Sequence, residues 1–213
     1  MKHTIRLTTA SLALAGALTA APAMAGLEGN IGVASNYIWR GVTQTNDGAS
    51  VSGGLDYSTD AGFYVGTWTS NVDFGGGDVG YELDLYGGYG MELGGVSIDL
   101  GYIYFAYPSQ DDSDFSEVYA NFGFGAFNAG VAYQVDADST DENYLYLSLG
   151  ADFDLGNDYG VSIYGGNYDF GDDGDDLTHF GVSLSKGDFG IALDKNDSDD
   201  DDPRVTVSWS KTF

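Results

Sequence analysis

The last nine residues, Val205–Phe213, read VTVSWSKTF. Val205, Val207 and Trp209 stand at alternate positions, and serine or threonine stands at the positions between them. Successive side chains of a strand point to opposite faces, so one face of this segment is apolar and the other is polar. The pattern predicts a strand that separates an apolar environment from water.

The same alternation recurs along the chain in segments of roughly ten residues, which is typical of strands that face two environments. In segment 63–70 both faces carry apolar residues, and in the others one face is mainly apolar. The twelve expected strands are 30–40, 49–58, 63–70, 79–90, 96–107, 116–124, 127–135, 143–153, 159–166, 178–185, 189–193 and 204–213.

The links between these segments alternate between long and short. Outer-membrane barrels have long extracellular loops and short periplasmic turns. A sheet that spans a bilayer must also close, because an unpaired edge in hydrocarbon leaves backbone groups without hydrogen bonds. The sequence therefore predicts an all-β fold, a closed antiparallel transmembrane β-barrel of about 12 strands with both termini in the periplasm. The alternative is an acidic soluble β-sandwich with tyrosine-rich sheets.

Residues 1–25 have the features of a secretory signal peptide. Lys2 and Arg6 precede an apolar stretch, and Ala23-Met24-Ala25 follows it as a small-residue cleavage pattern. The apolar stretch is about 15 residues long, too short to cross a bilayer as a helix. We expect residues 1–25 to be cleaved and residues 26–213 to form the barrel in the outer membrane of a Gram-negative bacterium. The chain has no cysteine, so no disulfide stabilises it.

Negative charge dominates the composition. All 33 acidic residues follow residue 25, and with five Lys or Arg they give residues 26–213 a formal charge of −28. This charge repels nucleic acids, which we exclude as partners. Six long links hold 21 of the acids, and the densest groups are expected at the mouth of the barrel: Asp172, Asp173, Asp175, Asp176, Asp199, Asp200, Asp201 and Asp202.

These loop carboxylates are the oxygen ligands that Ca²⁺ and Mg²⁺ prefer. The runs lack the spacing of a calcium loop with its distal glutamate, so a diffuse cation atmosphere is favoured over an ordered site. We expect no cofactor beyond weak Ca²⁺ or Mg²⁺ binding at the acidic loops. An acidic surface adapted to saline water predicts the same composition.

The sequence gives no support for an enzyme. His179 is the only histidine after the signal peptide. Ser183 shares its face but lies four residues away, about 13 Å along a strand, too far for the hydrogen bond of a catalytic triad. We expect no catalytic residues, and His179 is interpreted as a polar residue of the lumen or rim.

The polar face of the strands is expected to line the lumen. The candidate lumen and selectivity residues are Arg40, Asp56, Glu82, Asp84 and Asp99. Arg40 is the only cation between the signal peptide and Lys186, so we expect it to bridge lumen acids or to reach the outer rim. Two functions follow: a small diffusion channel for cations or neutral solutes, or a non-conducting barrel whose acidic loops bind divalent cations, lipopolysaccharide or a surface partner.

Glycine and tyrosine are abundant, with 33 and 16 copies. Glycine permits the tight curvature of a narrow barrel and leaves room for a neighbouring tyrosine to cover it. Many tyrosines fall near strand ends, which is typical of the aromatic girdles at the two membrane interfaces.

Three stretches resemble a known family. They are SNYIWRGVTQTNDGASVSGGLDYS (Ser35–Ser58), GFYVGTWTSNVDF (Gly62–Phe74) and YELDLYGGY (Tyr81–Tyr89). They resemble the TorF-type porin family of proteobacteria, strongly over residues 26–107 and more loosely afterwards. The resemblance implies an outer-membrane β-barrel of poorly defined function, with outer-membrane lipid and lipopolysaccharide as its surroundings.

The C-terminal segment resembles a broader pattern, the terminal strand that the barrel-assembly machinery reads in outer-membrane proteins. Trp209 and Phe213 match this assembly signal, which implies the assembly machinery as a partner. Lys211 departs from the pattern, but its long side chain could extend to the headgroup layer.

Overall fold

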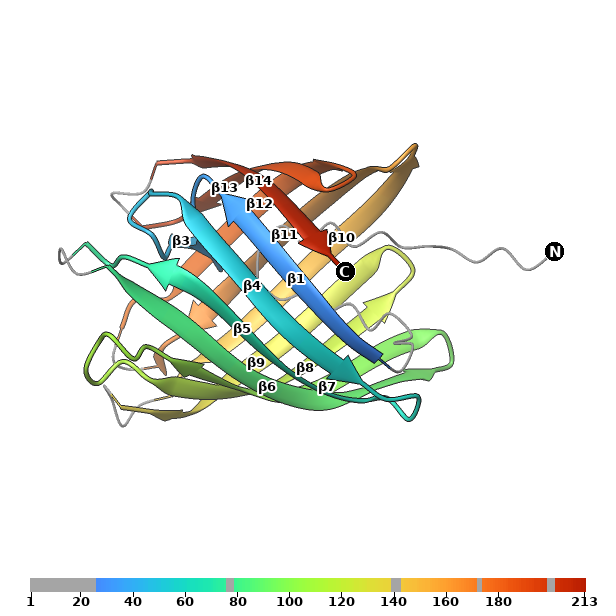
Figure 1. Cartoon of the computed structure of the whole chain (residues 1–213), viewed down its shortest axis with the longest axis horizontal. Helices are drawn as coiled ribbons and strands as arrows, with labels where there is room; N and C mark the ends of the chain where they lie inside the picture. Colours follow the sequence, from blue (N-terminus) through green and yellow to red (C-terminus); the bar gives the residue numbers. More distant parts are fainter. Residues whose placement is uncertain (1–25, 76–78, 139–142, 172–173, 199–201) are drawn as a thin grey trace.

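The computed structural model describes residues 26–75, 79–138, 143–171, 174–198 and 202–213. Within these ranges twelve strands close into an antiparallel barrel, and β2 and β3 form a separate two-stranded hairpin (Figure 1). None of the described residues belongs to a helix long and apolar enough to span a bilayer. The expected signal peptide, residues 1–25, lies outside the described residues.

The wall of the barrel follows chain order, and each strand pairs with the next. Its strands are β1 (Gly26–Ala34), β4 (Ser50–Ser58), β5 (Phe63–Val72), β6 (Gly80–Leu93), β7 (Val96–Ala106), β8 (Phe115–Phe124), β9 (Phe127–Ala137), β10 (Leu145–Gly156), β11 (Tyr159–Asp169), β12 (Leu177–Lys186), β13 (Phe189–Asn196) and β14 (Arg204–Thr212). The hairpin strands are β2 (Ile38–Trp39) and β3 (Val42–Thr43).

The barrel closes between the first and the last strand. β1 pairs with both β4 and β14, and Val33 lies opposite Trp209. Phe213 continues this ladder beyond β14, because its backbone N–H and carbonyl both bond to Gly29 at 2.9 Å. Pairing leaves no free edge in the wall, as a sheet surrounded by hydrocarbon requires. The predicted twelve-stranded antiparallel barrel is confirmed.

The two ends of the barrel differ in the length of their links. The turns after β4, β6, β8, β10 and β12 are short and lie at one end, where β1 also begins and β14 ends (Figure 1). The links after β1, β5, β7, β9, β11 and β13 are longer and lie at the other end. The predicted alternation of long and short links is confirmed.

The outer face of the wall is apolar and exposed. Leu149 is 72% exposed, Phe180 is 64% exposed and Val205 is 59% exposed, each on the face predicted to be apolar. Soluble proteins rarely expose apolar surface over such an area, whereas membrane barrels carry it as a lipid-facing band. The strand phase inferred from the alternation is confirmed, and the alternative of a soluble sandwich is wrong.

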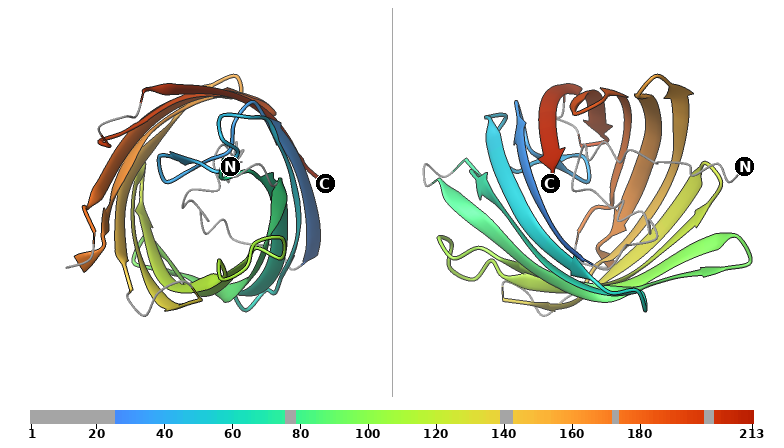
Figure 2. Two further views of the ribbon diagram at one scale, coloured as in Figure 1. Left: turned by 90° about the vertical axis from the view of Figure 1, so that its left-hand side faces the viewer. Right: turned by 45° about the vertical axis from the view of Figure 1, so that its right-hand side comes forward.

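The first expected strand, 30–40, is wrong beyond Ala34. After this residue the chain leaves the wall and enters the lumen as the β2–β3 hairpin (Figure 2). Arg40 and Gly41 have φ values of 48° and 82°, and Trp39 pairs with Val42. Two central residues with positive φ are typical of the tightest hairpin turn, which reverses the chain within two residues. Trp39 therefore does not reach the lipid-facing surface.

Many tyrosines point inward, and others, such as Tyr57 and Tyr81, are exposed on the outer face, where aromatic girdles were expected. At Gly101 an added Cβ would lie 2.3 Å from Cζ of Tyr119, and at Gly166 it would lie 2.3 Å from the hydroxyl of Tyr146. These glycines leave space for a ring from the adjacent strand, as we expected of glycine in a narrow barrel. The inner wall is built from tyrosine rings that lie over glycine backbone.

Candidate functional site: the lumen hairpin and the inner wall

The hairpin bridges opposite sides of the lumen. The hydroxyl of Tyr37 donates to Oε1 of Glu82 on β6 at 3.2 Å, and Nδ2 of Asn196 on β13 donates to the carbonyl of Gly41 at 3.0 Å. β6 and β13 stand on opposite sides of the twelve-stranded ring. In the view along the barrel, the hairpin segment crosses the interior of the ring (Figure 2). The hairpin therefore narrows the lumen at the end of the long links.

Arg40 at the tip of the hairpin is held by the inner wall. Its Nη1 and Nη2 donate to the two carboxylate oxygens of Glu117 at 2.6 and 2.8 Å, and Nη1 also donates to the hydroxyl of Tyr168 at 3.2 Å. The guanidinium carbon lies 4.0 Å from the ring centroid of Tyr146 and 4.4 Å from that of Trp39. A bidentate ion pair between aromatic faces is among the strongest ways to hold a guanidinium. We name these four partners the Arg40 cage.

Arg40 keeps its charge in this buried place. Burial acts to lower the pKa of Arg40, but Tyr168 and the carboxylate of Glu117 outweigh burial and raise it well above its usual range. Glu117 itself is 1% exposed. The expectation that Arg40 pairs with a lumen acid is confirmed, and the alternative that it reaches the outer rim is wrong. Arg40 reaches Glu117 from the hairpin and not from a wall strand.

Glu82 and Asp84 face the lumen but are covered. They are 1% and 0% exposed, and Tyr37, Trp68 and Tyr107 form part of an apolar cluster at the same end of the barrel. Burial, and after it the nearby Glu82, raises the pKa of Tyr37 well above its usual range, so this phenol stays protonated and donates. Contact of Glu82 and Asp84 with a solute path stays a prediction, and it requires the hairpin to move.

Asp56 and Asp99 lie on the same inner face, nearer the short turns. The hydroxyl of Tyr86 donates to Asp56, and the hydroxyl of Tyr64 donates to Oδ1 of Asp99 at 2.7 Å. Asp56 is half-buried, whereas Asp99 is 3% exposed. Asp56 is therefore the predicted selectivity residue that water reaches in the described conformation. The role of both acids in selectivity stays a prediction.

His179 lies on the inner wall beside the Arg40 cage. It is buried, its Nε2 is 2.7 Å from the hydroxyl of Tyr146, and the two rings stack with centroids 5.9 Å apart. This placement agrees with the interpretation of His179 as a polar lumen residue. The contact with Tyr146 gives it a role in packing the cage wall.

The acidic mouth is only partly described. Asp175, Asp176 and Asp202 are exposed, as expected of loop residues. The other expected mouth acids, Asp172, Asp173, Asp199, Asp200 and Asp201, lie outside the described residues. Across the part of the chain that the structure describes, no three acidic or histidine side chains gather in a way that could hold a metal ion. Weak Ca²⁺ or Mg²⁺ binding at these loops stays a prediction.

The two residues of the expected assembly signal close the barrel. Trp209 lies opposite Val33 on β1 and Phe189 on β13. Phe213 is 78% exposed, and its ring lies over Gly29, where an added Cβ would be 2.9 Å from it. Both residues lie on the strand that closes the barrel against β1. Their recognition by the assembly machinery stays a prediction.

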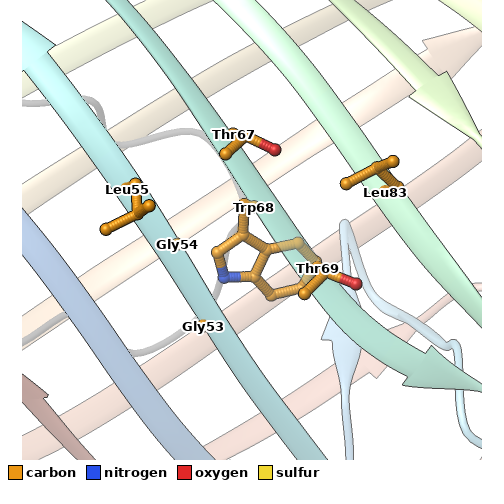
Figure 3. Close-up of a pocket in the computed structure, with 7 residues that line it drawn as sticks. All are labelled: Gly53, Gly54, Leu55, Thr67, Trp68, Thr69 and Leu83. Carbon is orange, nitrogen blue, oxygen red and sulfur yellow. The ribbon is translucent and has the colours of Figure 1, made fainter.

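A shallow groove of about 300 Å³ lies on the barrel wall over β4, β5 and β6 (Figure 3). Leu55 and Leu83 flank it, and Gly53 contributes no side chain between them. Trp68 lies behind the groove with its indole on the inner side of the wall. The groove opens on the apolar outer face and has no charged side chain in its lining. We therefore take the lumen, with its charged and polar side chains, as the candidate functional site.

Sequence reasoning missed the hairpin and part of the cage. Glu117, Tyr146 and Tyr168 were not among the candidate site residues. A weak local signal does exist, because Gly41 can adopt the positive φ of a tight hairpin turn and lies between the pairs Ile38-Trp39 and Val42-Thr43. Strands of two residues are too short for the alternation to reveal them.

Comparison with known proteins shows the fold. The "KdgM porin" structure aligns over 87% of this chain and 98% of its own, with a TM-score of 0.59 and 9% identity. "KdgM porin in complex with disordered oligogalacturonate" aligns over 88% and 97%, with a TM-score of 0.57 and 8% identity. A NanC porin structure aligns over 88% and 98%, with a TM-score of 0.50 and 9% identity. This chain therefore has the barrel fold of these porins.

The family is shown by sequence. No curated protein matches the chain. Residues 19–207 match the family described as "Bacterial protein of unknown function (Gcw_chp)". The match covers nearly the whole barrel. The chain therefore belongs to the Gcw_chp family of bacterial proteins.

Proposed function

We propose that the protein is an outer-membrane channel for small cations or neutral solutes, narrowed by the β2–β3 hairpin. The observation that carries this proposal is a hairpin that crosses an acid-lined lumen and is held at Glu82 and Glu117. The apolar outer band and the porin fold support a place in the outer membrane of a Gram-negative bacterium. The resemblance to TorF-type porins supports the same conclusion.

The size of the barrel supports passage of small solutes only. Twelve strands ~4.8 Å apart and tilted ~40° give a backbone radius of roughly 12 Å. Inward side chains occupy roughly 5 Å of this radius, which leaves a few ångströms on each side of the axis. The hairpin takes up part of this space at the end of the long links. Only ions and small molecules fit such a path.

The charge of the lumen supports a preference for cations. Asp56, Asp99 and Asp152 lie on the inner wall of the half nearer the short turns, and the buried cation Arg40 is already paired with Glu117. One fixed charge ~4 Å from an ion contributes about 1 kcal/mol in water and several-fold more near protein. An oligogalacturonate, the compound named with one structural neighbour, is a polyanion that these acids would repel. We therefore propose a different solute class for this chain.

A second candidate is a non-conducting barrel whose acidic loops bind divalent cations, lipopolysaccharide or a surface partner. It is favoured by the burial of Glu82, Asp84 and Glu117, which the hairpin separates from water. In this case the hairpin would be a permanent plug. The exposed acids Asp175, Asp176 and Asp202 would then carry the function.

Reversal potentials in planar bilayers with a KCl gradient test the channel. We expect a small conductance with a cation preference of about tenfold, smaller at 1 M salt where the screening length is ~3 Å. A preference for anions would contradict the proposal. The absence of current from correctly folded protein would favour the non-conducting candidate.

Orientation is tested by labelling single cysteines, since the chain has none of its own. Ser113 and Ser198 belong to the long links, and Asn157 belongs to a short turn. We expect a membrane-impermeant thiol reagent to label Ser113→Cys and Ser198→Cys on intact cells and to leave Asn157→Cys unlabelled. Labelling of all three would contradict a periplasmic location of the short turns and the termini.

A further inference from the structure

Four of the side chains around Arg40 come from the inner wall and not from the hairpin. Glu117 on β8, Tyr146 on β10, Tyr168 on β11 and Tyr144 just before β10 belong to the wall. The hydroxyl of Tyr144 donates to Oε1 of Glu117 and so holds the carboxylate in place. Tyr168 and Tyr146 pack with ring centroids 4.7 Å apart. We name these four residues the wall site.

The wall site has the chemistry that recognises a guanidinium. The carboxylate of Glu117 accepts two parallel N–H bonds, which match the planar fork of a guanidinium and not the point charge of an alkali ion. The face of Tyr146 lies 4.0 Å from the guanidinium carbon and favours a cation. The hydroxyl of Tyr168 accepts a third bond at 3.2 Å. The hydrogen-bond geometry, the negative charge and the aromatic face of the wall site thus all favour a guanidinium.

Arg40, which occupies the wall site in this structure, belongs to the β2–β3 hairpin. It stands in the left-handed region with φ 48°, which residues other than glycine adopt at a cost in free energy. The hairpin contains two strand pairs, Ile38 with Thr43 and Trp39 with Val42, and hydrogen bonds from Thr43 and Thr45 to Asn36 close its base. A two-stranded ribbon is marginal in isolation, so its contacts with the wall hold it in the lumen. Arg40 therefore fills the wall site as a ligand would, and the site itself is made by residues of the wall.

We propose that the wall site is a guanidinium-binding site of the lumen, and that Arg40 occupies it as an internal substitute for guanidinium-bearing solutes. Such solutes take the place of Arg40 when the hairpin leaves the wall. The site stands on the geometry above, whereas its place on a solute path rests on the proposed function. Organic cations that carry a guanidinium are then the preferred solutes of the channel.

The test is a titration of the Arg40→Ala variant with methylguanidinium in detergent solution, followed by tryptophan fluorescence. Trp39 lies beside the position of the guanidinium and reports on it. We expect saturable binding that is at least tenfold tighter in Arg40→Ala than in the wild type, whose site is filled. Adding Glu117→Gln to Arg40→Ala should weaken the binding at least tenfold, because the carboxylate fork is lost.

Three probes at equal concentration and ionic strength are the controls. Urea has the shape of guanidinium without its charge, tetramethylammonium has the charge without N–H donors, and potassium has neither shape nor donors. Each should bind Arg40→Ala at least tenfold more weakly than methylguanidinium. No saturable methylguanidinium binding to folded Arg40→Ala, or equal binding to the variant that also carries Glu117→Gln, would overturn the proposal.

Two further outcomes keep the test decisive. If Arg40→Ala does not fold, Arg40→Gln is titrated instead, since it keeps a side chain of similar length without the charge. Binding without current in bilayers supports the wall site and contradicts the channel. Current without binding overturns the wall site and leaves the channel in place.

Discussion

The two ends of the lumen use the same kind of wall in different ways. At the end of the long links, Glu82 and Glu117 are each 1% exposed, because the hairpin packs over them. At the end of the short turns, Asp152 lies on the inner face, accepts a hydrogen bond from Asn128 at 2.8 Å and remains exposed. The alternation of the strands delivers acids to both ends. The inserted hairpin covers those at its own end, and at the other end Asp152 stays exposed while wall side chains cover Asp99.

The two ends also balance their charges differently. At the hairpin end one acid has a cation, since Arg40 pairs with Glu117. The neighbouring carboxyl groups hold atoms without a hydrogen-bond partner among the described residues, namely Oε2 of Glu82 and both oxygens of Asp84. At the other end tyrosine and asparagine donate to the acids, as Tyr64 does to Asp99. The comparison teaches that the hairpin end buries two carboxyl groups beside one paired acid, whereas neutral donors hold the acids at the other end.

The largest expected effect follows from breaking the Arg40 pair. Glu117→Gln leaves Arg40 buried without its counter-charge, which destabilises a protein by about 3–5 kcal/mol. Asp152→Asn, at the exposed end, should change the free energy of unfolding by less than about 1 kcal/mol. Urea unfolding of both variants in lipid vesicles measures the difference. Equal losses from the two variants would contradict the distinction between the ends.

A smaller effect is expected from the tyrosine that lies over glycine. In Gly101→Ala the new Cβ displaces the ring of Tyr119, and overpacking of this kind costs about 1–3 kcal/mol. Removing the ring as well, in Gly101→Ala with Tyr119→Ala, should make the glycine substitution itself nearly neutral. Urea unfolding of the single and double variants tests this coupling. Additive effects would show that the ring does not depend on the glycine.

The smallest effect is expected on ion selectivity, and it should differ between the ends. Asp56→Asn removes a charge that water reaches, so the cation preference should fall by a few-fold, in keeping with about 1 kcal/mol per charge. Glu82→Gln with Asp84→Asn should leave the reversal potential unchanged while the hairpin covers them. A large shift from the covered pair would show that the path runs beside β6 in the wild type.

The wall could be predicted from the sequence and the hairpin could not. Lipid on one side and polar groups on the other impose a period of two on every wall strand, so residues such as Val205 and Leu149 reveal their face directly. The segment after Ala34 does not face lipid, because Tyr37 and Ile38 are buried inside the barrel. Its alternation at Tyr37 and Trp39 imitates a wall strand, which is why the first strand was extended to residue 40.

The sequence predicted that Arg40 pairs with an acid, but it did not predict which acid. The isolation of Arg40 among acids indicated a buried ion pair, since a confined charge needs a partner. The choice of Glu117 over Asp84 depends on the position of the hairpin tip, which is set by tertiary contacts on β13 and β6. The ring of Tyr146 over Gly166 also joins residues from neighbouring strands, which no local pattern reveals.

The central claim is that the hairpin narrows a cation-preferring path, and its removal tests this claim most directly. Ala34 and Ser50 are paired in the wall, so a short Gly-Ser linker can replace residues 37–47 without opening the barrel. Deletion of residues 139–141, from another long link, is the matched control. The measurement is the single-channel conductance and reversal potential of each variant in planar bilayers with a KCl gradient. We expect at least a several-fold larger conductance without the hairpin, with a cation preference maintained by Glu82, Asp84 and the released Glu117, and no change in the control. An unchanged conductance, or a preference for anions, in the folded variant without the hairpin would contradict the account.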